Sequence, residues 1–461
     1  MQKSYINLEL GEQAKNWHYL LAVFYLVPSN PDDDLLWLAT EVAAESSTWS
    51  NMRVNTATPF SDSMNALVYK IDREKNLVRY AYPTRIFDRW GNIQNITTYI
   101  AWNIFWMSSV SAMKLLDVWF PPAFLENYDG PSYTLDDMRK YLNVYDRPIL
   151  WTIIKPKIWL TASEYAEVCY DYWIWGGDFV KNDEPQADQD FCPYDHMVKN
   201  VKEAMDKAVS ETGHKKVHSF NVSSADFDEM IRRCELIKNT FELGSYAFLV
   251  DWITAWWMAI QTVRRKYPEV FLHFHRAWHG AYTRPENPIW FTVPVLSKLA
   301  RLAWSSWIHT GTAGVGKMQW NVSEDVTAAD QILFAHAQGH FFSQDRWKIP
   351  AKDSDWINVV KEDSEHHVTL ETDSRRGMKK TCPIISGGLN PLKLQPFVKA
   401  IGHVDFITTM GWWVHAHPGG TRAGAMAQRQ AGDALQKWID IYEYAKTNPE
   451  LAQAIEFYGK K

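Results

Sequence analysis

Eight short apolar runs alternate with helix-length segments through the last two thirds of this chain. The runs lie at residues 149–154, 179–181, 217–222, 247–250, 270–274, 305–309, 383–385 and 406–409. The helix-length segments between them lie at 163–173, 196–210, 225–238, 254–265, 293–303 and 392–400. Eight strand–helix units in succession predict a (β/α)8 barrel. A doubly wound open sheet is the alternative, but no G-x-G-x-x-G motif follows the first run.

The first 130 residues have a different pattern, which mixes strands and helices. Strands are predicted at 17–27, 66–71 and 77–82, and helices at 31–44 and 93–107. We therefore predict a ferredoxin-like α+β domain at residues 1–130 and a barrel domain at residues 131–461. The turn-forming sequence Tyr128-Asp129-Gly130-Pro131 marks the boundary. Between the sixth and seventh runs the spacing is too long for one loop, which predicts an inserted segment at 321–375.

Composition and charge argue against several classes of protein. The chain has a formal net charge of -6 and no basic tract, so we expect no nucleic-acid partner. Its longest apolar run, 247–260, is too short to cross a membrane and contains Asp251. The four cysteines have no C-x-x-C spacing, which argues against a disulfide framework or a zinc site. The N-terminus lacks the apolar core of a signal peptide, so we expect a cytoplasmic protein.

A lysine and two carboxylates lie within four positions at the end of the second run. Side chains alternate along a strand, so Lys181 and Asp183 point the same way, and Glu184 follows at the strand's end. An ion pair at a solvated strand end is one interpretation. The other is a Mg²⁺ site, because this ion prefers oxygen ligands. An ammonium group suits such a site only if CO2 has converted it to a carbamate.

Other strands of the predicted barrel also end in polar or glycine-rich residues. These strand ends carry Lys155 and Lys157, His275 and Arg276, His309, and Ser386 with Gly387 and Gly388. Taken singly, each is explained as a solvated lysine or a hydrogen-bonded core histidine. Catalytic groups of such barrels lie at the carboxyl ends of the strands. Together these residues therefore predict an active site there.

Two further motifs point to rival functions. Residues 311–317 match most of G-x-x-x-x-G-K, but Met318 stands where a nucleotide triphosphatase needs serine or threonine. We interpret this segment as a mobile loop whose Lys317 closes over a bound anion. His273 and His275 share one strand face, as in barrel metallohydrolases that use a carboxylated lysine. Those enzymes carry the pair on the first strand, whereas here it is on the fifth.

These motifs together resemble the large subunit of ribulose-1,5-bisphosphate carboxylase/oxygenase (Rubisco), in particular the archaeal form II/III type. The resemblance covers essentially the whole chain and rests on the order and spacing of the motifs. The matching segments are 43–48, 103–105, 152–157, 177–184, 275–279, 309–312, 316–317 and 386–388. The predicted insertion corresponds to a segment that helps dimers of that type to assemble into larger rings.

The resemblance implies Mg²⁺ and CO2, the latter held as a lysine carbamate. Lys181 would carry the carbamate and would bind the metal with Asp183 and Glu184. The metal would polarise ribulose 1,5-bisphosphate, and the carbamate would remove its C3 proton to give an enediolate. CO2 would then add to give two molecules of 3-phosphoglycerate, with O2 as the competing substrate.

Further roles are implied by the same resemblance. Lys155, its pKa lowered by Lys157, would protonate the carbanion after cleavage. His275 would assist proton transfer, and Lys317 would stabilise the incoming carboxylate. The implied substrate-binding residues are Arg276, His309, Ser386, Gly387, Gly388 and Gly411, with Glu45 and Asn103 reaching in from a partner subunit. The implied assembly is a homodimer with shared active sites, or a ring of such dimers (a decamer).

Tryptophan marks the main departure from the family, since the chain has 24 tryptophans and 22 glycines. The family has small residues, mostly glycine, at the positions of Trp49, Trp102, Trp106, Trp151, Trp159, Trp252, Trp304, Trp307, Trp320, Trp412 and Trp413. Trp49 and Trp412 matter most, because glycine there lets the backbone approach a phosphate. One overpacked site typically costs about 1–3 kcal/mol.

Three functions therefore stay open. The first is a bisphosphate carboxylase, which the retained Lys155, Lys157 and Lys317 favour. The second is a Rubisco-like enolase or isomerase acting on a phosphorylated ketose. The third is a catalytically impaired, structural member of a ring assembly. Tryptophan near the phosphate sites counts toward the last two.

Overall fold

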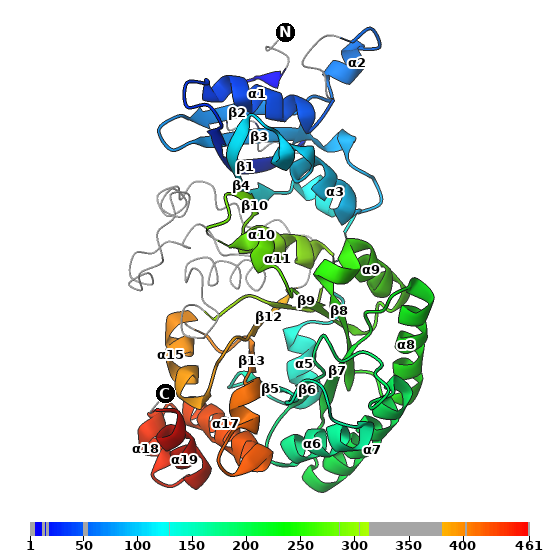
Figure 1. The fold of residues 1–461 in the computed structure, drawn as a ribbon, viewed down its shortest axis with the longest axis vertical. Coiled ribbons are helices and arrows are strands. Elements are labelled where there is room, and N and C mark those ends of the chain that lie inside the picture. Colours follow the sequence, from blue (N-terminus) through cyan, green and yellow to red (C-terminus); the bar gives the residue numbers. More distant parts are fainter. Residues whose placement is uncertain are drawn as a thin grey trace. The chain divides into compact units, whose positions relative to one another are not determined.

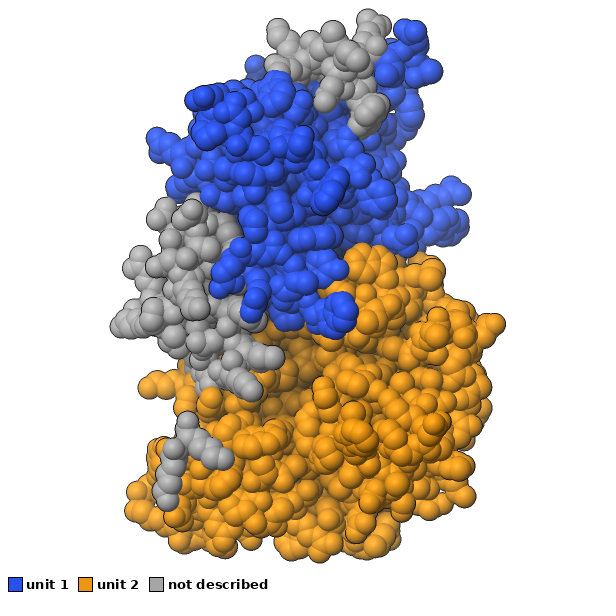
Figure 2. All heavy atoms as spheres, viewed as in Figure 1, with its two compact units in different colours: residues 1–130, 278–303, 330–379 blue, residues 131–277, 304–329, 380–461 orange. Residues whose placement is uncertain are grey.

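The computed structural model describes residues 5–11, 14, 18–48, 54–128, 130–284, 286–303, 305–312, 380–401 and 403–459. Lys317, Trp49 and the predicted insertion at 321–375 lie outside the described residues. The chain divides into two compact units (Figure 2), one of residues 1–130, 278–303 and 330–379 and one of residues 131–277, 304–329 and 380–461. The two units are groups of residues that lie close to one another in space. They do not test the predicted domain bounds, which stay a prediction.

The second unit contains a closed barrel of eight parallel strands, which confirms the predicted fold (Figure 1). In hydrogen-bonding order the strands are β5 (Ile149–Ile153), β6 (Phe179–Lys181), β7 (Val217–Asn221), β8 (Tyr246–Asp251), β9 (Phe271–His275), β11 (Trp307–His309), β12 (Cys382–Ile385) and β13 (Ile407–Thr409). β13 pairs with β5 and closes the barrel. Each predicted apolar run forms one strand, and the strands follow one another around the barrel in chain order.

One helix of this unit, α5 (Leu135–Leu142), precedes the first barrel strand, and the others follow strands in the chain and form an outer layer (Figure 1). The others are α6 (Ala162–Ile174), α7 (Tyr194–Thr212), α8 (Phe227–Thr240), α9 (Trp252–Lys266), α15 (Pro391–Ile401), α16 (Gly411–His415), α17 (Gly420–Gln436), α18 (Ile441–Ala445) and α19 (Pro449–Tyr458). Side-chain caps fix where two of them begin. The Thr161 N–H donates to the Glu164 carboxylate at 2.8 Å before α6, and Asp226 accepts from the Glu229 N–H at 2.8 Å before α8. In the described ranges, no helix is both long enough and apolar enough to cross a membrane.

Aromatic rings fill the interior of the barrel. Trp151 stacks on Phe179 with ring centroids 4.4 Å apart, and Trp307 stacks on Phe271 at 4.8 Å. The ring of His273 meets Trp151 edge-on at 5.0 Å. All five side chains are buried. The barrel is therefore a packed core, and open space for a substrate is left only at the ends of its strands.

The first unit is built on a five-stranded sheet in the order β10–β4–β1–β3–β2. Its strands are β1 (Tyr19–Pro28), β2 (Leu67–Asp72), β3 (Leu77–Pro83), β4 (Val110–Trp119) and β10 (Ile289–Phe291). Its helices are α1 (Leu35–Glu45), α2 (Pro59–Asp62), α3 (Ile93–Ile100), α4 (Pro122–Leu125), α10 (Gly280–Thr283) and α11 (Val293–Leu302). The predicted strands and the first predicted helix form. The second predicted helix is shorter than expected, because α3 ends at Ile100 and residues Asn103–Trp106 form a separate 3-10 turn.

Two strands of this sheet, β4 and β10, were not predicted. Two buried charged residues, Lys114 and Asp117, interrupt the apolar pattern of β4. Lys114 Nζ donates to the carbonyls of Tyr282 and Arg284 at 3.0 Å each, and Asp117 pairs with the buried Lys298 of α11. These polar groups hold the segment around β10 against β4. Their charges interrupt the apolar pattern, so the sequence does not indicate a buried strand there.

Candidate active site at the carboxyl ends of the barrel strands

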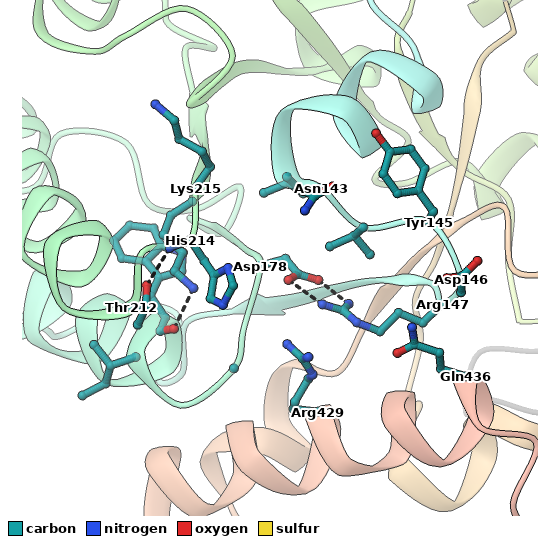
Figure 3. Close-up of a pocket in the computed structure, with 16 residues that line it drawn as sticks. Asn143, Tyr145, Asp146, Arg147, Asp178, Thr212, His214, Lys215, Arg429 and Gln436 are labelled. Atoms are coloured by element: carbon teal, nitrogen blue, oxygen red, sulfur yellow. Dashed lines mark hydrogen bonds and ion pairs between the residues drawn. The ribbon is translucent and has the colours of Figure 1, made fainter.

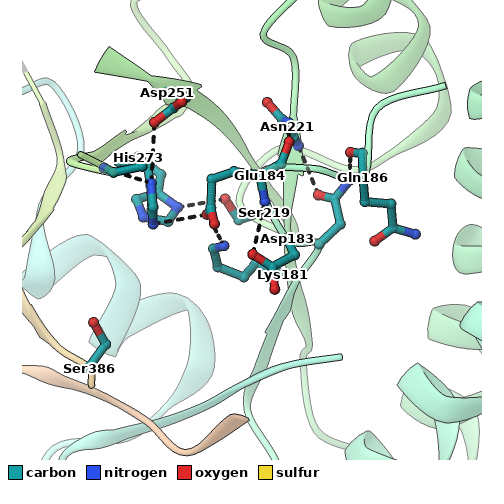
Figure 4. A network of polar contacts seen from close by, with 12 residues as sticks. Lys181, Asp183, Glu184, Gln186, Ser219, Asn221, Asp251, His273 and Ser386 are labelled. Atoms are coloured by element: carbon teal, nitrogen blue, oxygen red, sulfur yellow. Dashed lines mark hydrogen bonds and ion pairs between the residues drawn. The ribbon is translucent and has the colours of Figure 1, made fainter. Parts of the chain in front are cut away.

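The ends of β5 and β6 bring the predicted lysines and carboxylates together. In the barrel register Ile153 lies opposite Lys181, so Lys155 comes beside Asp183 two residues further on. Lys155 pairs with Asp183. Lys181 pairs with Glu184 (Figure 4). The side chain of Lys181 is fully buried, whereas the two carboxylates are 10% and 18% exposed. Two cations and two anions thus balance one another at one end of the barrel.

His275, the last residue of β9, links carboxylates from two other strands. Its Nε2 lies 2.9 Å from Glu184 Oε1, and its Nδ1 lies 3.4 Å from Asp251 Oδ1. Burial alone would lower the pKa of His275, but the two carboxylates, Glu184 above all, raise it. Burial would likewise raise the pKa of Glu184, yet His275 and Lys181 hold it well below its usual range. His275 and Glu184 thus stabilise each other's charged form.

A chain of hydrogen bonds crosses the barrel next to this pair. Ser386 Oγ lies 2.6 Å from His309 Nδ1, and His309 Nε2 lies 3.1 Å from His273 Nε2. His273 Nδ1 lies 3.0 Å from Ser219 Oγ. Burial, followed by neighbouring positive charge, lowers the pKa of both imidazoles well below the usual value. Both rings are therefore neutral at pH 7, and they connect β7, β9, β11 and β12 in one polar network.

Several residues of the network were missed in the sequence. The Asn221 N–H donates to Asn182 Oδ1 at 2.8 Å, and Asn221 Nδ2 donates to the Glu184 carbonyl at 2.9 Å (Figure 4). These bonds hold the Asn182 side chain and the Glu184 backbone, on either side of Asp183. Asn221 and Asp251 are the last residues of β7 and β8. That strand-end position, shared with the predicted residues, is the local signal that points to them, but it does not distinguish an orienting residue from a helix N-cap.

Other predicted residues lie at the same strand ends. Arg276 is buried directly after β9. Gly387 and Gly388 follow β12 with φ values of +121° and +90°, where a side chain would be strained. Gly411 begins α16 after β13, and a Cβ at this position would lie 3.6 Å from Lys155 Cε. A side chain at position 411 would thus contact the candidate catalytic lysine.

The remaining predicted residues have different surroundings. Lys157 is exposed after β5. Glu45 and Asn103 belong to the first unit, where Asn103 Nδ2 donates to Glu45 Oε1 at 3.0 Å. Trp412 is about half exposed, and its ring meets that of Trp413 edge-on at 4.6 Å. The predicted roles of these residues stay predictions.

A cavity of about 230 Å³ lies at the opposite, amino-terminal ends of β5, β6 and β7 (Figure 3). Arg147 grips Asp178 there through two bonds of 2.6 and 2.9 Å. Lys216 donates to the Trp173 and Gly177 carbonyls at 2.9 and 3.1 Å, and burial lowers its pKa to about 8. We interpret this ion pair and these hydrogen bonds as stabilising the fold, because catalytic groups of barrels lie at the other end of the strands.

Two family models and several curated relatives match nearly the whole chain. The model described as "Ribulose bisphosphate carboxylase large chain, catalytic domain" matches residues 134–355 and 351–458, and the model of the N-terminal domain matches residues 4–124. The ribulose bisphosphate carboxylase of Rhodobacter capsulatus is 38% identical over 98% of this chain and 95% of that protein. That of Rhodopseudomonas palustris (strain HaA2) is also 38% identical, over 98% of this chain and 94% of that protein.

Two solved structures are similar over nearly their whole length. The dimeric archaeal Rubisco from Hyperthermus butylicus has a TM-score of 0.83 and 30% identity, and the match covers 99% of each chain. The octameric Rubisco from Pyrococcus horikoshii has a TM-score of 0.84 and 26% identity, with 100% of this chain and 97% of that chain covered. From its two matched domains and its curated relatives, the chain belongs to the ribulose bisphosphate carboxylase large-chain family.

Proposed function

We propose that this protein is a ribulose-bisphosphate carboxylase. It would join CO2 and water to ribulose 1,5-bisphosphate and cleave the adduct into two molecules of 3-phosphoglycerate. The observation that carries the proposal is the grouping of Lys155, Lys181, Asp183 and Glu184 at one end of the barrel, in a chain of this family. The curated relatives bear the carboxylase name, so they lend no support to the isomerase or to the inactive alternative.

The residues at the strand ends fit a Mg²⁺ ion by their chemistry. This ion prefers anionic oxygen ligands, and Asp183 and Glu184 supply two carboxylates beside Lys181. A carbamate formed from the Lys181 amine and CO2 would add a third anionic ligand in place of a positive charge. Bound there, Mg²⁺ would polarise the C2 carbonyl of the substrate and make the C3 proton more acidic.

The protein's own residues would position the substrate and move protons. Lys155, beside Asp183, would deliver a proton to the carbanion left by C–C cleavage. His275, oriented by Glu184 and Asp251, would exchange a proton with a substrate hydroxyl. Lys157 would keep positive charge near Lys155, and Lys317 would meet the incoming carboxylate. Each role is supported by family membership, and those of Lys155 and His275 also by the contacts described above.

Phosphate binding would be divided between two sets of groups. Arg276 and His309 would bind one phosphate, Arg276 through paired N–H donors. The backbone N–H groups at Gly387, Gly388 and Gly411 would bind the other, since positive φ at the first two suits close approach of an anion. Ser386, already bonded to His309, would hold the sugar chain.

The proposal also includes the competing reaction with O2 and a homo-oligomer. A dimer in which Glu45 and Asn103 complete the partner's site is the unit we propose, with a ring of dimers as the larger form. The dimeric and octameric structures that this chain resembles support an assembly of this kind. A cytoplasmic location belongs to the same proposal, and four buried, free cysteines suit a reducing compartment.

The test is a carboxylation assay with labelled bicarbonate. The purified protein is preincubated with Mg²⁺ and bicarbonate, ribulose 1,5-bisphosphate is added, and label in 3-phosphoglycerate is measured. We expect labelled product that requires both the metal and the preincubation. A folded protein that yields no labelled product would overturn the proposal, and conversion of the bisphosphate without label would point to the isomerase.

A further inference from the structure

Tryptophan occupies backbone conformations that this residue type avoids. Within the described residues, seven residues other than glycine have positive φ. Two are asparagines, which tolerate this region. The other five are all tryptophan: Trp159 (+91°), Trp256 (+61°), Trp278 (+66°), Trp290 (+88°) and Trp438 (+56°). A bulky residue at positive φ is an outlier, and five of one residue type point to a common cause.

Trp438 stands at the position where a helix normally ends in glycine. Helix α17 ends at Gln436, and Lys437 is its C-cap. The Ile439 N–H donates to the Ala434 carbonyl at 2.9 Å, and the Trp438 N–H donates to the Leu435 carbonyl at 3.0 Å. This pair of bonds is the Schellman motif, whose left-handed residue is usually glycine because it has no Cβ to strain. The hydrogen bonds thus require a left-handed residue at position 438, and glycine is the usual one.

Trp256 is held in a still rarer conformation. Its φ is 61° and its ψ is 178°, inside helix α9, where the chain breaks between two helical pieces. This combination lies at the edge of a region that is essentially restricted to glycine. The backbone at position 256 therefore requires glycine more strictly than the helix end at position 438 does.

At three of the five positions, burial of the indole does not explain why tryptophan stands there. The side chains of Trp159, Trp278 and Trp438 are 75%, 72% and 86% exposed. A side chain that remains in water gains little hydrophobic free energy to offset a strained backbone. Three other tryptophans have the opposite problem: Trp151, Trp173 and Trp307 are fully buried, and their indole N–H groups have no hydrogen-bond partner among the described residues.

We propose that positions 159, 256, 278, 290 and 438 are glycine positions, and that the protein made in its own cell carries glycine at them. A single codon that is translated as tryptophan in the present sequence, but is read as glycine in the protein's own cell, would account for all five positions. The same reading would account for a chain with more tryptophan than glycine. The inference stands on backbone geometry and does not depend on the proposed function.

Peptide mass spectrometry of the protein from its own cells tests the decoding directly. Trypsin releases residues 438–446 as one peptide, since Lys437 precedes it and Lys446 ends it. We expect a mass that corresponds to glycine at position 438, lower by the difference between the two residues. Tryptophan at position 438 in the native peptide would overturn the proposal.

A set of recombinant variants tests the backbone requirement. Trp438→Gly and Trp256→Gly are compared with Trp438→Ala and Trp256→Ala, since alanine also removes the indole but keeps the Cβ. A left-handed residue with a Cβ costs about five- to thirtyfold in the folding equilibrium. We therefore expect each glycine variant to have an unfolding constant at least about fivefold lower than its alanine partner. The control is Trp37→Gly within helix α1, which should instead raise the unfolding constant. Alanine and glycine variants of equal stability would contradict the inference.

Discussion

The imidazole of His275 is held between carboxylates from two different strands, with Nε2 2.9 Å from Glu184 and Nδ1 3.4 Å from Asp251. Asp251 is itself fixed, because its backbone N–H donates to Ser223 Oγ at 2.8 Å and its Oδ2 accepts from Thr254 Oγ1 at 2.9 Å. Asp251 on β8 therefore orients the ring through Nδ1, while Nε2 faces the candidate metal ligand Glu184. We therefore predict that Asp251 is a positioning residue that acts through His275.

Asp251→Asn should lower kcat and leave KM for the bisphosphate nearly unchanged. The amide keeps the shape of the carboxylate but removes the charge that orients the imidazole. Loss of such an orienting partner typically costs about 10- to 100-fold. Steady-state carboxylation kinetics check this, with Asp195→Asn in an exposed ion pair as the control. A variant with unchanged kcat, or with its loss confined to KM, would show that Asp251 has only a structural role.

Lys181→Met should abolish carboxylation while the protein stays folded. Methionine has a similar length and fills the fully buried site, but it has no amine to react with CO2. Glu184 keeps His275 as a partner, so its charge is not left alone. We expect a loss of about 10³-fold or more, because removal of one member of a catalytic unit costs at least about that much. Activity and the thermal midpoint are measured together, beside Lys202→Met in an exposed pair. Activity within tenfold of the original would exclude the proposed carbamate.

The eight barrel strands could be predicted because parallel strands are buried on both faces and appear as continuous apolar runs. Strand β10 could not be predicted, because its three residues form a strand only by pairing with β4, which lies far away in the sequence. β4 was concealed by Lys114 and Asp117, whose partners are supplied only by the folded chain. Tertiary pairing, which no local pattern contains, decided both cases.

In the candidate site, Lys155, Lys181, Asp183 and Glu184 were predicted together because strand order and pairing follow from the barrel itself. Asp251 was not, since a single aspartate between a strand and a helix is also the ordinary pattern of a helix N-cap, the position that it occupies before α9. Nothing local distinguishes such a residue from one that orients a histidine. Only the contact between β8 and β9 does.

Asp178→Asn should destabilise the barrel strongly without changing the activity of the folded protein. Both Asp178 oxygens accept from the buried Arg147, and one also accepts from the Leu150 N–H at 2.9 Å. Removing one partner of a buried pair leaves the other charge uncompensated, which costs about 3–5 kcal/mol. Urea unfolding measures this, with the exposed Asp206→Asn as the control. A loss below about 1 kcal/mol would mean that water reaches Arg147 when Asp178 is neutral.

The partly buried His415 should make the protein sensitive to acid. Its Nε2 lies 3.2 Å from Thr152 Oγ1 and its Nδ1 lies 3.0 Å from Thr421 Oγ1. Burial lowers its pKa to about 4, against about 6.5 in an unfolded chain. Between these values the unfolded state binds a proton that the folded state does not, so stability falls as the pH drops from about 6.5 toward about 4.

His415→Gln retains hydrogen-bonding groups and removes this titration. Between pH 7 and pH 4.5, the original protein should lose about 2–3 kcal/mol more free energy of unfolding than the variant. Urea unfolding at both pH values measures the difference. His196→Gln, at an exposed position on α7, is the matched control and should keep the pH dependence of the original protein. If His415→Gln kept that dependence too, the acid sensitivity would have to come from other groups, and the neutral state assigned to His415 would be wrong.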